Sequence, residues 1–195
     1  MKKCLALLLL LLICATPALA DQNRVIDESD VLSFSDESRL EQAISLIRQQ
    51  YKFDVVLLTT PTIDGREARY YAGDYYDYNG FGCNDTHDGI ILLLVTGAEE
   101  GNREYAIVMT GRGEKIFTDA VLYSIEDDIL PHLRISNYSV AVRRFVEDVE
   151  FQLSLEALAS APSKSEIHQA NNGIAFVIAT IVYYIVSHIL NGGIQ

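Results

Sequence analysis

The sequence has few residues of several types, and each scarcity excludes a class of protein. Its 195 residues include three cysteines, which are too few for a disulfide-rich scaffold. Basic side chains are also scarce, because 15 Lys and Arg stand against 27 Asp and Glu, a formal net charge of −12. A nucleic-acid-binding protein needs a basic surface, so this balance argues against one. At 49% hydrophobic residues the composition is still that of a folded protein, and the length is typical of about one domain.

Common catalytic signatures are missing as well. The sequence contains no G-x-S-x-G nucleophile motif, no Walker phosphate loop and no H-E-x-x-H zinc motif. Outside the two terminal segments, the histidines His87, His132 and His168 are widely separated. A histidine-based nucleophilic site is therefore not expected, and the sequence names no catalytic residue.

The amino-terminal segment has the pattern of a secretory signal peptide. Two lysines precede an apolar run, Leu5–Ile13, and a small-residue cleavage site follows at Ala18–Ala20, so we expect removal of residues 1–20. An uncleaved anchor is the alternative. A lipid-attachment signal is disfavoured, because Ile13 precedes Cys14 where such a signal has a small residue.

The carboxy-terminal segment contains the second apolar run. Residues 173–190 hold no Asp, Glu, Lys or Arg, and as a helix they reach about 27 Å, enough for a bilayer core. A polar linker over residues 159–172 precedes this run, and a short tail over residues 191–195 follows it. We expect a transmembrane helix, with a buried helix of the domain as the alternative. The signal peptide then places the domain on the periplasmic or exterior side of the inner or plasma membrane.

The segment between these ends is strongly acidic. Loss of residues 1–20 removes two lysines and no acids, which leaves 13 basic and 27 acidic side chains and a net charge of −14. It also leaves Cys83 as a single cysteine, which cannot form an internal disulfide. A buried or loop thiol is the preferred interpretation, and an intermolecular disulfide is the alternative. We therefore expect one acidic domain over residues 21–158.

Helical and strand patterns alternate along this domain. The expected elements are, in order, a helix capped by Ser35, a strand over Phe53–Thr60, a helix over Arg66–Tyr78, strands over Ile90–Val95 and Glu104–Met109, a helix over Asp119–Asp128 that Pro131 stops, and a helix over Tyr138–Leu158. A short turn separates the last two strands, which predicts an antiparallel hairpin. Continuously apolar strands indicate a sheet covered on both faces. The pattern predicts an α/β fold, a three-layer α/β/α sandwich with a mixed sheet.

Acidic and polar residues gather in the loops that precede these elements. They occupy the stretches 25–30, 84–89, 111–114 and 118–119. Oxygen-rich loops that converge at one edge of a sheet are how proteins bind hard cations such as Ca²⁺ or Mg²⁺. The alternative is that acids at helix starts favour the helix dipole and keep the surface soluble.

Several segments, taken in order, resemble the TPM domain family, which includes thylakoid-lumen and photosystem-II repair proteins and bacterial membrane-tethered proteins. The matching stretches are V-I-D-E-S-D-V-L-S, Phe53–Thr59, N-G-F-G, D-G-I-I-L-L-L-V, V-M-T-G-R-G-E-K-I-F-T-D-A and D-I-L-P-H-L-R-I-S-N-Y. They extend over about residues 24–155. The resemblance implies an α/β/α sandwich and, in some members, Ca²⁺-type metal binding and acid phosphatase activity.

The resemblance also implies site residues. By position, Asp27, Asp88 and Asp119 are the candidate metal ligands, together with Glu114. In the glycine-containing stretch of this sequence, Arg112 is a candidate for holding phosphate, and the alternative is that it balances nearby acids. The metal would be Ca²⁺ or Mg²⁺.

Two functions are compatible with this sequence. The first is a membrane-tethered, extracytoplasmic, metal-binding domain that helps to assemble, maintain or repair a membrane protein complex, with the tyrosines of Arg66–Tyr78 as a binding face. The alternative for those tyrosines is a half-buried helix with hydroxyls at its rim. The second function is a divalent-metal-dependent acid phosphatase, in which the cation polarises a phosphate monoester and activates water.

Overall fold

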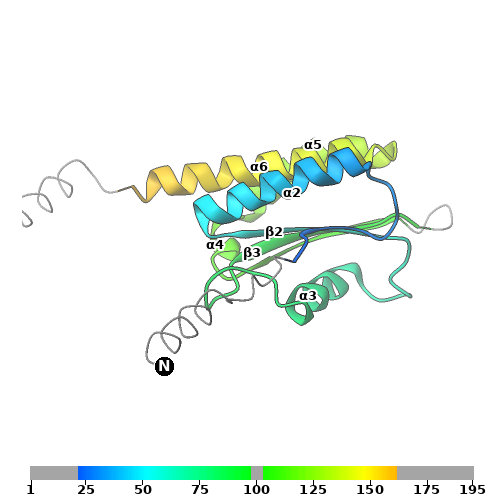
Figure 1. Ribbon diagram of the computed structural model, residues 1–195, viewed down its shortest axis with the longest axis horizontal. Helices are drawn as coiled ribbons and strands as arrows, with labels where there is room; N and C mark the ends of the chain where they lie inside the picture. The colour runs from blue at the N-terminus through cyan, green and yellow to red at the C-terminus, as the bar shows by residue number, and fades with distance from the viewer. Residues whose placement is uncertain (1–21, 98–102, 162–195) are drawn as a thin grey trace, which may run out of the picture. The chain divides into compact units, whose positions relative to one another are not determined.

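A four-stranded sheet forms the middle layer of the computed structural model, which describes residues 22–97 and 103–161 (Figure 1). The strands are β1 (Val25–Asp27), β2 (Asp54–Thr60), β3 (Gly89–Val95) and β4 (Glu104–Thr110), and they lie side by side in this order. The first three strands are parallel, and β4 pairs antiparallel with β3. The mixed sheet and the antiparallel hairpin are therefore confirmed. The three-residue β1 was not predicted, since so short a strand leaves no periodic pattern.

Five helices accompany the sheet in the described part of the chain: α2 (Phe34–Tyr51), α3 (Ala68–Tyr78), α4 (Gly113–Ile116), α5 (Asp119–Arg134) and α6 (Tyr138–Ala159). The chain divides within α6 into two units, residues 1–148 and 149–195, and the sheet belongs to the first. In that unit α2, α5 and the start of α6 cover one face of the sheet and α3 covers the other (Figure 1). The three-layer arrangement matches the prediction. In the second unit, the described end of α6 exposes Phe151 and Leu158.

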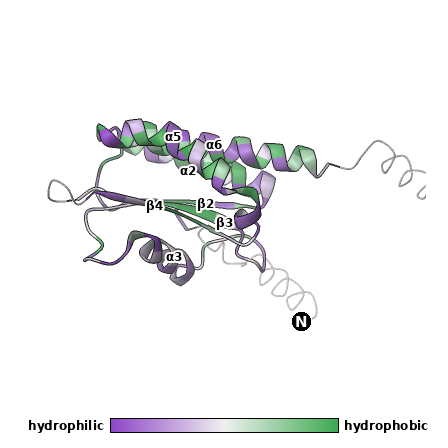
Figure 2. Ribbon diagram, turned by 180° about the vertical axis from the view of Figure 1, so that it is seen from behind, coloured by the Kyte–Doolittle hydropathy of each residue, from purple (hydrophilic) through white to green (hydrophobic). Residues whose placement is uncertain are grey.

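The core is built on the two central strands. All seven residues of β2 and all seven of β3 are buried, which confirms a sheet covered on both faces. Figure 2 shows their apolar residues between the helical layers. Toward α3, alternate strand residues pack with Tyr76 and Phe81, whose ring centroids lie 5.8 Å apart.

Three local predictions need correction. The cap of α2 is Ser33, whose hydroxyl accepts a hydrogen bond from the Asp36 N–H, and Ser35 lies inside the helix. Pro131 does not stop α5, which continues to Arg134. Pro131 is exposed and lies in the last turn, so it removes one backbone hydrogen bond and leaves the helix otherwise intact. The glycine-containing stretch Thr110–Glu114 leads into the short helix α4 instead of forming only a loop.

The predicted terminal segments lie almost entirely outside the described residues. These are the signal peptide at 1–20, the linker at 159–172 beyond Ala161, the membrane helix at 173–190 and the tail at 191–195. Over residues 22–97 and 103–161, none of the helices has the length and hydropathy that crossing a membrane requires.

Gly89 allows β3 to begin against a buried tyrosine. A Cβ atom at this position would lie 1.8 Å from the Tyr76 hydroxyl oxygen and 2.8 Å from the Asp54 carbonyl oxygen. Tyr76 is fully buried, and its hydroxyl donates to the His87 carbonyl oxygen at 3.4 Å, so the ring has little room to move. This close approach fixes the distance between α3 and the start of the strand.

We expect Gly89→Ala to lower the free energy of unfolding by about 3 kcal/mol, since the added methyl group forces a tightly packed core to shift. Gly73→Ala is the matched control, because the nearest atom to its added Cβ would be Val108 Cγ1 at 4.0 Å. Within α3, that change should be neutral or stabilise by up to about 1 kcal/mol. Urea unfolding, monitored by circular dichroism, measures the free energy of unfolding of both variants. Equal stability of the two variants would contradict the packing argument.

Candidate functional site

Asp88, one of the candidate metal ligands, is buried immediately before β3. Only 4% of the residue is exposed. Its Oδ1 accepts hydrogen bonds from the Thr86 hydroxyl at 2.6 Å and the Arg112 backbone N–H at 2.8 Å. Its Oδ2 accepts from the Asn84 side-chain amide at 2.8 Å and lies 3.7 Å from Arg112 Nε. The chain itself therefore occupies both oxygens of this carboxylate.

These contacts also set the charge of Asp88. Burial alone raises the pKa of the carboxyl, but the hydrogen bonds from Thr86, the Arg112 N–H and Asn84, together with the Arg112 charge, outweigh it and hold the pKa below its usual range. Asp88 is thus ionised at neutral pH. The negative charge holds the loop before β3 to the turn after β4.

Arg112 connects Asp88 to the end of α2. Its guanidinium donates to the carbonyl oxygens of Tyr51 and of Lys52, the latter at 3.5 Å. It also lies over the Phe53 ring, with 5.7 Å between the guanidinium carbon and the ring centroid. In this structure Arg112 satisfies carbonyl groups that a helix end leaves without partners.

A second buried carboxylate, Asp54, lies at the same end of the sheet. It is 0% exposed and accepts from Arg24 Nε at 3.1 Å, from Arg24 Nη2 at 3.3 Å and from the Gly82 N–H at 2.8 Å. Arg48 of α2 lies 3.7 Å away. Sequence reasoning missed this group. Its position at the start of an otherwise apolar strand was the available signal. A charge buried there requires partners, so basic residues were to be expected nearby.

A polar pocket of about 360 Å³ lies beside these ion pairs, and we call it the Lys52 pocket. Its lining residues are Ser45, Arg48, Gln49, Lys52, Gly82, Cys83 and Asn84. Two of them are basic and none is acidic, so the lining suits an anion. Burial, followed by the nearby Asp54 charge, raises the pKa of the Cys83 thiol, which is therefore protonated at neutral pH.

Asp27 lies at the opposite end of the sheet from Asp88. In the strand register Asp27 is paired with Thr59, and Thr59 is paired with Leu94. Leu94 is six residues beyond Asp88, which corresponds to about 20 Å along a strand. Asp27 accepts from the Leu32 N–H at 2.7 Å and from the Thr59 hydroxyl, so it stabilises the turn into α2. The structure does not bring Asp27 and Asp88 together.

Glu114 and Asp119 lie nearer to Asp88 along the chain. Glu114 is in α4, two residues after Arg112, and Asp119 is the first residue of α5; both are exposed. Among the residues that the structure describes, no three His, Cys, Asp or Glu side chains form a group that could hold a metal ion. Binding of Ca²⁺ or Mg²⁺ stays a prediction. Asp119 occupies the first turn of its helix, where a negative charge favours the helix dipole.

We expect Asp88→Asn to lower the free energy of unfolding at pH 7 by about 2–4 kcal/mol, because it leaves buried donors without a charged acceptor. The folded-state pKa of Asp88 is depressed, so its stabilisation is complete above about pH 4, the unfolded pKa, and is lost as pH falls through the folded pKa. Urea unfolding at pH 7, 5 and 3 should show the difference from wild type shrinking toward low pH. Asp85→Asn, an exposed change in the same loop, is the control. A constant difference at all three pH values would contradict this role.

Solved structures share this architecture. The N-terminal domain of a protein from P. gingivalis has a TM-score of 0.61 and 26% identity, over 71% of this chain and 87% of that one. The N-terminal domain of the cg2496 protein from Corynebacterium glutamicum has a TM-score of 0.55 and 19% identity, over 77% of this chain and 90% of that one. The BA42 protein from Bizionia argentinensis has a TM-score of 0.55 and 13% identity, over 71% of this chain and 90% of that one. The last two similarities concern the fold alone.

Sequence comparison gives a consistent result. The UPF0603 protein YdjH of Bacillus subtilis is 27% identical over 126 residues, which are 65% of this chain and 46% of the relative. The chain thus spans about half the length of this curated relative. The sequence pattern of the TPM domain matches residues 25–152, which include the whole sheet and every candidate site residue. The chain therefore belongs to the TPM domain family.

Proposed function

We propose that this TPM domain is a non-catalytic binding domain, held outside a membrane, that helps to assemble or maintain a membrane protein complex. The observation that carries this proposal is the exposed tyrosine face of α3. Tyr70 is 71% exposed and Tyr78 is 87% exposed, on the helix that covers this side of the sheet in the described part of the chain. Tyrosine is enriched at protein interfaces because its ring provides contact area and its hydroxyl a hydrogen bond.

The helix divides its tyrosines between core and surface. At about 100° per residue, Ala68, Ala72 and Tyr76 fall on the buried side. Tyr70 and Tyr78 project outward, on the other side of the helix. Tyr76 thus builds the core, whereas Tyr70 and Tyr78 have the exposure that a binding face requires.

Aromatic stacking orders Tyr71 and Tyr75, the tyrosines of α3 that are partly buried against the core beside this face. The rings of Tyr71 and Tyr75 stack with 6.4 Å between centroids, and Arg66 lies 5.0 Å over the Tyr71 ring. Arg66 also forms an ion pair with Asp74 of the same helix. Ordered side chains lose less conformational entropy on binding, which favours an interface.

Charge defines the class of partner. The tyrosine face carries Asp77 and the Asp74–Arg66 ion pair, and the whole chain has a net charge of −12. Electrostatic complementarity therefore favours a basic protein surface. The placement of that partner in a membrane complex rests on the signal-like residues 1–20 and the apolar run 173–190 of the sequence.

The described acids favour binding over catalysis. Asp88 and Asp27 accept hydrogen bonds on both of their oxygens from groups of the chain itself. Each is thus accounted for as a structural carboxylate. This supports a domain whose polar residues maintain a binding surface.

A photo-crosslinking amino acid in place of Tyr70 or Tyr78 tests this proposal in native membranes. We expect one membrane protein with a basic surface to be crosslinked from both positions, and the yield to fall in high salt. The matched control is the same substitution at Tyr123, which is 65% exposed on α5. Equal crosslinking from Tyr123, or none from α3, would overturn the α3 interface.

The second candidate, a divalent-metal-dependent phosphatase acting on phosphate monoesters, is favoured by one observation. The Lys52 pocket has two basic residues, no acidic residue, and neutral donors at Ser45 and Asn84. Such a lining suits a phosphate group. The lining offers no carboxylate to a Ca²⁺ or Mg²⁺ ion, so a metal that polarises the phosphoryl oxygen would have to enter bound to the phosphate.

Hydrolysis of p-nitrophenyl phosphate by the full chain, with added Ca²⁺ or Mg²⁺, tests this candidate. If the Lys52 pocket holds the phosphate, Lys52→Gln should lower kcat/KM about tenfold, roughly the effect of one lost charged hydrogen bond. Lys115→Gln is the matched control, because Lys115 lies outside the pocket lining. No hydrolysis with either metal, or equal loss in both variants, argues against phosphatase activity at this pocket.

A further inference from the structure

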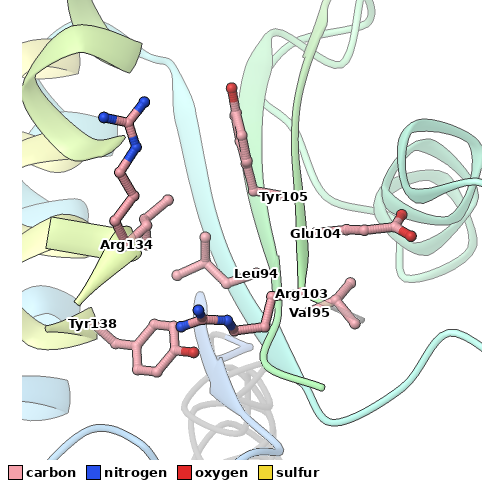
Figure 3. Close-up of a pocket in the computed structure, with 8 residues that line it drawn as sticks. Leu94, Val95, Arg103, Glu104, Tyr105, Arg134 and Tyr138 are labelled. Carbon is pink, nitrogen blue, oxygen red and sulfur yellow. The ribbon is translucent and has the colours of Figure 1, made fainter. Parts of the chain in front are cut away.

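A second pocket lies on the face of the sheet that α2 and α5 cover, near the carboxyl end of β3. It has a volume of about 280 Å³, and we call it the Arg134 pocket. Its walls are the hairpin strands β3 and β4 on one side, and the end of α5 with the start of α6 on the other (Figure 3). In open α/β sheets, ligands bind outside the carboxyl ends of the strands.

The floor of this pocket is apolar. Leu94 of β3 is buried and pairs directly across the hairpin with Tyr105 of β4. The ring of Tyr138 lies on the opposite wall (Figure 3), and Leu133 of α5 also lines the pocket. The Tyr105 hydroxyl donates to Glu126 at 3.2 Å, so this residue contributes mainly its ring. These groups suit the hydrocarbon part of a ligand.

Two arginines flank the floor. Arg103 donates to the Ser136 hydroxyl at 2.8 Å, which holds its guanidinium near the turn between α5 and α6. No hydrogen bond or ion pair holds the side chain of Arg134 within the described part of the chain. The one acid among the lining residues, Glu104, points toward the α3 side of the sheet (Figure 3). The arginines therefore have no carboxylate within the pocket.

We propose that the Arg134 pocket binds a carboxylate group attached to a small apolar body. Guanidinium groups bind carboxylates with two parallel hydrogen bonds, and the apolar floor buries the attached hydrocarbon. The volume lies at the low end for small-molecule pockets, which matches a body about the size of a leucine side chain. This site lies on the other face of the sheet from α3 and goes beyond the function proposed above.

A carboxylate attached to a small apolar body has two sources. It is either a free small carboxylic acid or the last residue of a protein chain, whose α-carboxylate accompanies an apolar side chain. The chemistry is the same in both cases. A titration with 4-methylpentanoate, with the peptide acetyl-Ala-Ala-Leu and with the carboxy-terminal amide of that peptide separates them.

The experiment is calorimetric titration of the full chain, purified in a neutral detergent, with each of the three probes. We expect binding of at least one acid, no binding of the amide, and at least tenfold weaker binding by Arg134→Gln. Arg143→Gln is the matched control, since Arg143 is an exposed arginine of α6 that pairs with Glu147 outside the pocket. Circular dichroism confirms that both variants are folded.

Each outcome decides the proposal. Binding of the peptide acid supports a protein terminus as the source, and binding of 4-methylpentanoate alone supports a free acid. No binding of either acid at millimolar concentration overturns the proposal. Equal binding of the amide, or unchanged binding by Arg134→Gln, overturns it as well.

Discussion

The fold depends on one buried carboxylate. Asp54 begins a strand whose other residues are apolar or hydroxylated, and it joins the residue before β1, the end of α2 and the loop after α3 through Arg24, Arg48 and the Gly82 N–H. A charge in so dry a place is tolerated only with close partners, and removal of one partner from such a group typically costs 3–5 kcal/mol. The carboxylate thus specifies which segments meet at this end of the sheet.

The end of the sheet that holds Asp54 also holds a second ion pair, Asp88 with Arg112. The ion pairs of Asp54 and of Asp88 hold neighbouring segments of the chain together. Arg112 satisfies carbonyl groups at the end of α2, while Arg48 of the same helix faces Asp54. Most charge near the start of β3 therefore serves architecture. The two pockets differ from this pattern in part. The lining of the Lys52 pocket holds no acid, although its Arg48 faces Asp54, and the one acid that lines the Arg134 pocket, Glu104, points toward the α3 side of the sheet.

The sequence predicted the layers and failed on the grouping of the acids, for a physical reason. Continuous apolar runs in β2 and β3 allow only a sheet buried on both faces, so the sandwich followed from them. The three residues of β1 leave no pattern, and without that strand the end at which Asp27 lies cannot be assigned. Asp27 ends one parallel strand whereas Asp88 precedes another, which places them at opposite ends. Local sequence likewise gives no sign that Asp54 meets Arg24, because this contact depends on tertiary packing.

The two faces of the sheet are covered unequally, and this asymmetry determines where family members can change their surface residues without loss of the fold. On one side, among the residues that the structure describes, the 11-residue α3 is the one helix of the layer, and its buried residues are Ala68, Ala72 and Tyr76. The exposed positions of α3, such as Tyr70 and Tyr78, can be replaced without altering the core, so a new partner needs only a few substitutions on one short helix. The other side lacks this freedom, since several helices share its packing. Within the family, the α3 side of the sheet can therefore change to recognise new partners, while the other side preserves the fold.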